Sequence, residues 1–331
     1  MELVCPAGNL PALKAAVDNG ADCVYTGFRD DTNARNFAGL NFSADDLTTG
    51  IRYAHDRDAQ VFLAINTYPQ PHNWERWCAA IDRAAGLGAD AVIIADLGLI
   101  KYAAHKHPRL RLHLSVQGSA TTYEAINFYA RRFNITRAVL PRVLTLAQVR
   151  ALIDRCEAQI EVFAFGSLCV MVEGRCALSS YVTGEGPNLT GACSPASAVR
   201  WQQTAAGMES RLNGVLVDCY GASEKAAYPT LCKGRYRVGA ETYYAIEEPS
   251  SLNCLELLPE LKQMGVAAIK IEGRQRSPAY VAEVTRVFRH AIDACERDPV
   301  RYRIAPDWMT SLNRCAEGQQ VTLGAYHRPW R

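Results

Sequence analysis

The sequence lacks any long uninterrupted apolar run. Nowhere do about 18 apolar residues follow one another, the length that a helix needs to cross a bilayer. The opening segment MELVCPAGNLPALKAAV also lacks the charged part, apolar stretch and small-residue cleavage site of an export signal. We therefore expect a soluble, cytoplasmic protein with no membrane span.

An excess of charge of one sign is also missing. The 331 residues include 36 Lys and Arg and 34 Asp and Glu, well interspersed, so the formal net charge is +2. No long-range field that would attract nucleic acid or a membrane follows from this balance. Nucleic acid is neither excluded nor suggested, and we expect no stable nucleic-acid partner. The 49% of hydrophobic residues is enough for a sizeable core.

Short β-branched runs alternate with helical segments along most of the chain. Seven such runs precede residue 167, and an eighth comes much later. A nearly continuous apolar run of this length fits a strand that is buried on both faces, and alternation with helices implies parallel pairing. The fold class is therefore α/β, and a (β/α)8 TIM-like barrel is the economical interpretation. The runs are ELVCPAG, DCVYTG, VFLAINT, DAVIIADL, LHLSVQ, TRAVLP, EVFAFG and AAIKIEG.

The delay before the eighth strand predicts a long insertion. We assign residues 1–166 to strands 1 to 7 of the barrel, 167–250 to the insertion, 251–300 to strand 8 and the last helix, and 301–331 to a C-terminal extension. The insertion is rich in Gly, Ser, Thr and Pro and contains a probable hairpin in GRYRVGAETYYAI. Loops that follow barrel strands build the active face, so an insertion after strand 7 should lie there.

Cysteine is abundant, with twelve residues. Disulfides do not persist in the cytosol, so we ask whether these cysteines bind a metal or take part in redox chemistry. Eight cysteines lie in apolar strands, in helical patterns or without a near partner, and we assign them no ligand role: Cys5, Cys23, Cys78, Cys156, Cys219, Cys254, Cys295 and Cys315.

Four other cysteines lie in flexible contexts within the predicted insertion. Cys169 and Cys176 flank a Gly-containing turn directly after a strand, and Cys193 and Cys232 follow in TGACSPA and PTLCKGRY. Four thiolates without a matching His cluster suit either tetrahedral zinc or an iron-sulfur cluster, and their spacing does not choose between the two.

The stretch EVFAFGSLCVMVEGRCALS resembles the signature of the collagenase-like peptidase family. The matching residues are Glu161, Phe163, Gly166, Ser167, Leu168, Cys169, Gly174, Cys176 and Ser179. The usual Tyr and small residue before the second Gly are Val172 and Glu173 here, and this departure points to a particular branch. The blocks DDTNARNFAGLNF, GACSPA, YPTLCKGRY, IKIEGRQRSPAYV and TLGAYHRPW are similar to a branch that serves ubiquinone biosynthesis.

The resemblance implies a [4Fe-4S] cluster held by Cys169, Cys176, Cys193 and Cys232. It also implies a heterodimer with a second family member, a UbiV-like protein, and a lipid-carrier accessory protein as a possible further partner. The pair would hydroxylate the ring of a polyprenylated quinone precursor without dioxygen, with prephenate as the hydroxyl donor. Other family members hydroxylate RNA bases. The peptidase label finds no support, because the sequence has no H-E-x-x-H and no G-x-S-x-G motif.

Polar residues at predicted strand ends are the natural substrate contacts: Asn66, Asp96, Gln117, Arg142, Lys270, Glu272 and Arg274. Arg142 and Arg274 could grip a dicarboxylate, and Lys270 or Glu272 could act as catalytic groups that move protons. Equally, Lys270 and Glu272 could pair inside the barrel while Arg142 caps a helix.

The loop DDTNARNFAGLNF carries polar side chains between aromatic residues. Asn33, Arg35 and Asn36 lie beside Phe37 and Phe42, and such a set could bind a phenolic ring. Alternatively, the loop is pinned by its own amide hydrogen bonds.

Three functions remain open at this point. The first is a subunit of an enzyme for O₂-independent ring hydroxylation in ubiquinone synthesis. The second is an RNA-base hydroxylase subunit, for which a basic stripe would be expected. The third is a non-catalytic scaffold that bears the cluster and stabilises its partner.

Overall fold

The computed structural model describes residues 1–187, 192–318 and 320–328. Eight parallel strands close into a barrel, since β14 pairs both with β1 and with β7. The barrel strands are β1 (Glu2–Pro6), β2 (Cys23–Thr26), β3 (Gln60–Ile65), β4 (Ala91–Ile94), β5 (Arg111–Leu114), β6 (Ile135–Val139), β7 (Gln159–Ser167) and β14 (Ala268–Ile271). The predicted (β/α)8 TIM-like barrel is confirmed, with each strand on one of the eight apolar runs.

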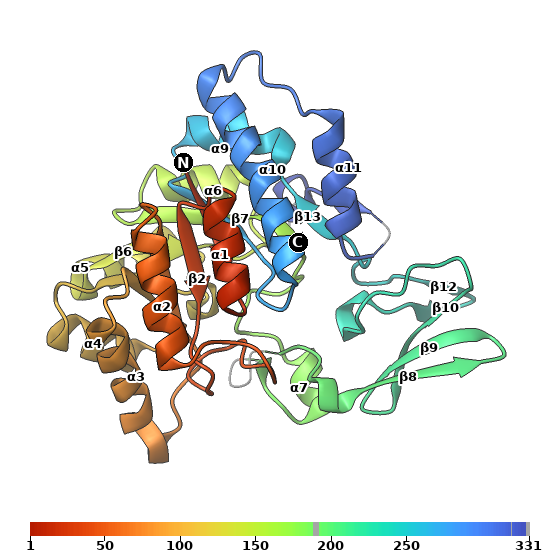
Figure 1. Cartoon of the computed structure of the whole chain (residues 1–331). Helices are drawn as coiled ribbons and strands as arrows, with labels where there is room; N and C mark the ends of the chain where they lie inside the picture. Colours follow the sequence, from red (N-terminus) through yellow and green to blue (C-terminus); the bar gives the residue numbers. More distant parts are fainter. Residues whose placement is uncertain (188–191, 319, 329–331) are drawn as a thin grey trace.

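Helices lie before or after the barrel strands along the chain and cover the outside of the barrel (Figure 1). They are α1 (Leu10–Asp18), α2 (Ala44–His55), α3 (Trp74–Gly86), α4 (Leu97–Lys106), α5 (Tyr123–Phe133), α6 (Leu146–Ile153), α9 (Leu258–Met264) and α10 (Pro278–Arg297). Their starts follow from local chemistry, because Ser43 and Thr145 form capping boxes at α2 and α6. The buried faces of these helices join the barrel strands in one large apolar core.

The chain between β7 and β14 leaves the barrel and returns to it. It contains α7 (Leu178–Thr183), β8 (Val199–Thr204), β9 (Gly207–Leu212), β10 (Val215–Tyr220), β11 (Tyr236–Val238), β12 (Glu241–Tyr243) and β13 (Ser251–Asn253). Strands β8 to β10 form an antiparallel sheet that extends away from the barrel in Figure 1. The hairpin predicted in GRYRVGAETYYAI is confirmed as β11 and β12.

Two further strands lengthen the barrel sheet beside β7. Strand β13 pairs antiparallel with the end of β7, and β15 (Val321–Thr322) pairs with β13 after the helix α11 (Pro306–Cys315). Short 3₁₀ helices complete the secondary structure: η1 (Pro71–Asn73), η2 (Val116–Gly118), η3 (Ala196–Ala198), η4 (Leu231–Lys233), η5 (Leu255–Leu257) and η6 (Gly324–Tyr326). Parts of the predicted insertion and extension, residues 188–191, 319 and 329–331, lie outside the described residues. The predicted domain boundaries stay a prediction.

Within the described part of the chain, no helix combines the length and the apolar character that a membrane crossing requires.

A charged network fills the amino-terminal part of the barrel interior. The Glu161 carboxylate accepts a hydrogen bond from Lys270 Nζ at 2.6 Å and lies 3.4 Å from Arg137 Nη1. Arg137 also donates to Glu2 at 2.6 Å and to Gln159 at 2.9 Å. Because Arg137, Glu161 and Lys270 are all at least 95% buried, each charge depends on its partners for the solvation that water would otherwise give.

Replacing Glu161 with Ala should therefore destabilise the fold strongly. The substitution leaves two buried cations without this carboxylate, and we expect a loss of about 3–5 kcal/mol in the free energy of unfolding. The matched control is Glu157→Ala, which breaks an exposed ion pair with Arg131 and should cost less than about 1 kcal/mol. Urea titration measures both losses, and equal losses would contradict the role given to the network.

Candidate active site

Arg274 lies just beyond β14, at the carboxyl-terminal mouth of the barrel, and is buried there. Its guanidinium donates to the Oδ1 atoms of Asn33 and Asn41, the latter at 2.9 Å. Asn33 in turn donates to the Phe28 carbonyl at 2.9 Å and accepts from the Arg35 amide at 3.0 Å. The loop after β2 is thus held by its own amide hydrogen bonds, and it also brings Asn33 against Arg274.

No carboxylate in the described residues forms an ion pair with Arg274. Its Nε atom is buried and has no hydrogen-bond acceptor among the described residues. Burial, together with the positive charge of Arg35, lowers the pKa of Arg274 to about 10 although Tyr25 and Glu272 act in the opposite direction. A buried cation without a paired anion is suited to an anionic ligand.

Glu272 also follows β14 and contacts the end of β7. Its Oε2 accepts a hydrogen bond from the Ser167 amide at 3.3 Å. Burial alone would raise the pKa of this carboxyl. The guanidinium groups of Arg142, Arg35 and Arg276 outweigh burial and hold the pKa below its usual range, so Glu272 is ionised at the mouth.

Lys270 lies deeper in the barrel than Glu272. Its ammonium pairs with Glu161 and lies 3.9 Å from the centre of the Tyr25 ring. The alternative in which Lys270 pairs with Glu272 is wrong. The reason is the register, since β14 aligns Lys270 with Phe163 whereas Glu272 passes the strand end and reaches Ser167.

Arg142 follows β6 and is held against an aromatic ring. Its guanidinium lies 3.8 Å from the centre of the Phe163 ring, and Nη1 lies 3.7 Å from Glu173 Oε1. The alternative that Arg142 caps a helix finds no support, because the next helix, α6, is capped by Thr145. Arg142 therefore already faces a carboxylate in this structure, in contrast to Arg274.

Three other residues predicted at strand ends have mainly scaffolding contacts. Asp96 caps α4 by accepting from the Leu99 amide at 2.8 Å. Asn66 accepts from the Ala34 amide at 3.0 Å and so joins two loops. The Gln117 amide donates to Ser115 Oγ at 3.2 Å, and the Gln117 carbonyl accepts from the Tyr68 hydroxyl at 2.8 Å.

The four candidate ligands come from three separate segments. Cys169 and Cys176 lie in the loop after β7, Cys193 precedes η3, and Cys232 lies in η4. Burial raises the pKa of Cys169, to about 12, and also raises the pKa of Cys193 and of Cys232. Lys233, the neighbour of Cys232, donates to Ser167 at the end of β7, so η4 is held against the strand end that leads into Cys169.

The donor set suits a four-thiolate cluster in kind and in number. Arg35, Lys233 and Arg142 are close enough to favour the thiolate form of Cys193, and such cations would offset the negative charge of a cluster. Among the described residues, however, no group of three or more His, Cys, Asp or Glu is close enough to hold a metal ion. The thiols would have to draw together to bind one.

Two residues at this site escaped prediction as functional groups. Lys233 is buried beside Cys232, and its Nζ donates to Ser167 Oγ at 2.9 Å. Glu173 lies between Cys169 and Cys176 in the sequence and has a side chain that is 12% exposed, although the sequence marked it only as a departure from the family signature. The adjacency of Lys233 to a candidate ligand was the available signal, but burial of a lysine cannot be seen in a sequence.

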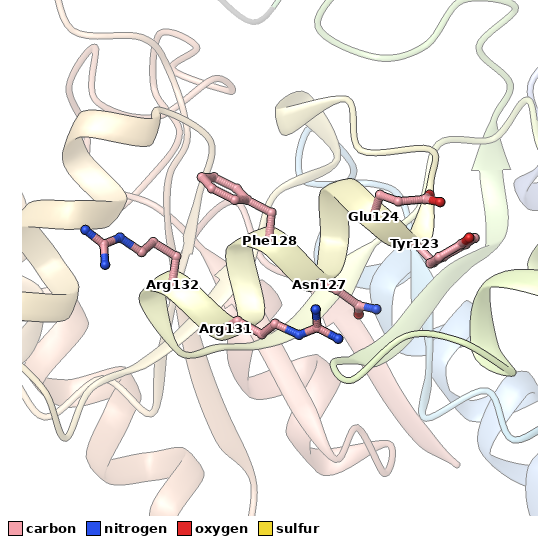
Figure 2. Close-up of a pocket in the computed structure, with 6 residues that line it drawn as sticks. All are labelled: Tyr123, Glu124, Asn127, Phe128, Arg131 and Arg132. Atoms are coloured by element: carbon pink, nitrogen blue, oxygen red, sulfur yellow. The ribbon is translucent and has the colours of Figure 1, made fainter.

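Three surface pockets lie away from the mouth. Figure 2 shows one of about 450 Å³ whose lining residues all come from α5: Tyr123, Glu124, Asn127, Phe128, Arg131 and Arg132. Another, of about 400 Å³, involves Trp74, Lys101 and Tyr102, and a third of about the same volume lies at the opposite end of the barrel beside Arg111 and His113. None of these three is lined by a residue that the sequence predicted for the site.

The model of Peptidase family U32 matches residues 8–329. The chain belongs to Peptidase family U32. This U32 protein is 29% identical over 321 residues to "tRNA hydroxylation protein P1" of Bacillus subtilis, covering 97% of this chain and 70% of that one. It is 33% identical over 299 residues to an "uncharacterized protease" of Methanocaldococcus jannaschii, covering 89% and 65%.

A third relative of the U32 protein carries a more specific name. It is the "23S rRNA 5-hydroxycytidine C2501 synthase" of Escherichia coli, 30% identical over 297 residues that cover 89% of this chain and 39% of the relative. The chain thus spans 70%, 65% and 39% of the lengths of these three relatives.

The close contact between Gly166 and Glu272 can be tested directly. Gly166 has φ +120°, and a Cβ there would lie 2.7 Å from Glu272 Cβ. Gly166→Ala should lower the free energy of unfolding by about 2–4 kcal/mol, since steric overlap adds about 1–3 kcal/mol to backbone strain of about 1 kcal/mol. Gly39→Ala is the matched control, with φ +78° and no atom within 4 Å of a built Cβ. Denaturant titration measures the free energy of unfolding of both variants. If both lose the same amount, Gly166 is not sterically required.

Proposed function

We propose that this U32 protein is the iron-sulfur subunit of an O₂-independent hydroxylase. It acts on the ring of a polyprenylated precursor in anaerobic ubiquinone biosynthesis, in a heterodimer with a UbiV-like protein. The observation that carries the proposal is the hydrogen bond from Lys233 to Ser167 at 2.9 Å, which holds the Cys232 segment against the strand end that precedes Cys169. The resemblance of the sequence blocks to UbiU gives the pathway, and relatives named for hydroxylation support the reaction type.

The four cysteines would hold a [4Fe-4S] cluster, which supplies one-electron transfer when bound. The chain's own contribution is to supply the four thiols from three segments and to set cations near Cys193. Arg35, Arg142 and Lys233 provide this positive environment. Thiolates rather than thiols are the ligands, so cluster binding would release the protons that burial now favours.

Arg274 is the better placed of the two arginines proposed to bind the oxygen donor. It is buried, has no ion-pair partner in the described structure, and is fixed by Asn33 and Asn41. Prephenate has two carboxylates, and one of them would form an ion pair with the Arg274 guanidinium. A second carboxylate at Arg142 would compete with Glu173, which lies 3.7 Å away.

Glu272 is better placed than Lys270 for proton transfer. Its carboxyl lies at the mouth and is ionised, so it can accept a proton from a ring hydroxyl or from the donor. The Lys270 ammonium is occupied by Glu161 inside the barrel. Lys270 thus acts by holding the strand ends in place beneath Glu272.

An RNA-base hydroxylase is the second candidate. It is favoured by relatives whose names specify tRNA and 23S rRNA. Against it stands the near balance of charge, because binding to a phosphate backbone usually uses a basic surface. A cluster-bearing scaffold remains the third, with chemistry on the partner.

Anaerobically purified protein should contain about four iron and four sulfide per chain, as one [4Fe-4S] cluster requires. Alanine at Cys169, Cys176, Cys193 or Cys232 should remove most of the iron, because each thiolate is one of the ligands. Alanine at Cys78 or Cys295, which lie in buried helix faces, is the control and should leave the iron in place. Stoichiometric zinc without acid-labile sulfide would refute the cluster.

Arg274→Ala should lower anaerobic quinone synthesis by roughly 10- to 100-fold when the chain is coexpressed with a UbiV-like partner. A charge-assisted contact is worth about 1.5–3 kcal/mol, and each 1.4 kcal/mol corresponds to a factor of about ten. Iron content and copurification of the partner should not change. Exposed Arg132 on α5 provides the control substitution, Arg132→Ala.

Measurements on the same cells distinguish the three candidate functions. Quinones and hydroxylated nucleosides of total RNA are measured together by mass spectrometry. Loss of a modified nucleoside with normal quinone in Arg274→Ala would favour the RNA substrate. Normal levels of both would favour the scaffold, and failure to copurify with the partner would exclude the heterodimer.

A further inference from the structure

The cavity of about 400 Å³ beside Arg111 and His113 opens at the amino-terminal end of the barrel, opposite the mouth. Its walls come from the first residues of three neighbouring strands, β5, β6 and β7, and from the end of α5. Thr136 contributes from β6 and Gln159 from β7. The cavity shares no residue with the candidate active site, so a ligand bound here would occupy a separate site.

Arg111 brings to this cavity a positive charge that no carboxylate neutralises. Its Nε donates to the Asp90 carbonyl at 3.0 Å and its Nη2 donates to Gln60 Oε1 at 2.8 Å. Both acceptors are uncharged, because the Asp90 carboxylate accepts from the Val61 amide instead and lies 2.8 Å from His55 Nε2. No carboxylate in residues 1–187, 192–318 or 320–328 forms an ion pair with Arg111.

The charged network next to Arg111 does not offset this charge. Arg137 donates to Glu2 at 2.6 Å, and Lys270 donates to Glu161 at 2.6 Å. These two cations use the two carboxylates of the network, and Arg111 is a third cation beside them. The amino-terminal end of the barrel interior therefore carries one positive charge in excess, which favours an anion.

His113 adds a buried polar group to the wall of the cavity. The residue is 1% exposed, and its ring meets the Phe62 ring edge-on with 4.7 Å between the ring centres. The Nδ1 atom has no hydrogen-bond partner in the described part of the chain. Burial, with the positive charges of Arg137 and Arg111, holds the pKa of His113 well below its usual range, so the ring is neutral. A buried polar atom of this kind normally has a partner, and a polar ligand would supply one.

Two groups of negative polarity also border the cavity, and both already have partners. Glu157 accepts from Arg131 Nε at 2.8 Å. The carboxyl-terminal end of α5 is capped, because the Asn134 amide donates to the Ala130 carbonyl at 2.9 Å. Neither group leaves an uncompensated negative charge to oppose an anion.

We propose that this cavity binds a small organic acid with a single carboxylate, which forms an ion pair with Arg111. Arginine suits a carboxylate because its planar guanidinium offers parallel donors. One negative charge matches the excess of one positive charge, and the volume admits a molecule larger than an inorganic ion. The Gln159 Oε1 atom is used by Arg137, so its Nε2 group is left to donate to the ligand. The site requires neither a cluster nor the proposed function.

Calorimetric titration with benzoate and with benzamide tests the site, because the two probes have the same ring and nearly the same size, but only benzoate is charged. Benzoate should bind roughly 10- to 100-fold more tightly, as a charge-assisted contact implies. Arg111→Gln should remove this preference, and Arg111→Lys should retain part of it. Exposed Arg109 gives the matched control, Arg109→Gln, which should bind like the wild type. Arg274→Ala, altered at the mouth, should also keep the preference.

A second variant narrows the cavity without changing Arg111. Ala130 lines the cavity from α5, and Ala130→Leu should weaken the binding of both probes, so it decides the outcome if Arg111→Gln does not fold. Failure of the wild type to bind benzoate, equal affinities for the two probes, or unchanged benzoate binding in Arg111→Gln or Ala130→Leu would overturn the inference. Tighter binding of inorganic phosphate than of benzoate would overturn the assignment to an organic acid.

Discussion

Closure of the barrel between β7 and β14 is the constraint on which the rest of the structure depends. The pairing joins residues about one hundred positions apart and sets Ala268 opposite Glu161. One consequence is the internal pair of Lys270 and Glu161, whose charges need each other because both are buried. The other is at the mouth, where Glu272 reaches the Ser167 amide. Because the two strands are parallel, the chain between them leaves β7 at the mouth and returns through α9 to the opposite end of the barrel, where β14 begins.

This geometry gives the mouth its electrostatic character. Strand ends and loops bring Arg35, Arg142 and Arg274 into the part of the site that also holds the carboxyls of Glu272 and Glu173. Burial and positive charge pull the pKa of Glu173 in opposite directions, and burial prevails, so this pKa is raised. A site with this balance is suited to additional negative charge, whether from thiolates or from a carboxylate ligand.

The barrel could be predicted from the sequence because its signal is local. Runs such as VFLAINT and DAVIIADL form β3 and β4, since strands buried on both faces require continuous apolar residues. The charge partners could not be predicted, because they depend on register and on loop paths. Lys270 meets Glu161 rather than Glu272, and Arg142 meets Glu173 from a different segment. The candidate cysteines were found by context and resemblance, whereas their mutual placement required the fold.

The central claim is that four cysteines from three segments hold one iron-sulfur cluster at the barrel mouth. Anomalous X-ray diffraction at the iron absorption edge, from crystals grown without oxygen, tests it most directly. The account predicts a single compact iron peak bounded by the sulfur atoms of Cys169, Cys176, Cys193 and Cys232. Iron bound elsewhere, or a mouth in which these four thiols remain apart and hold only zinc or nothing, would contradict it.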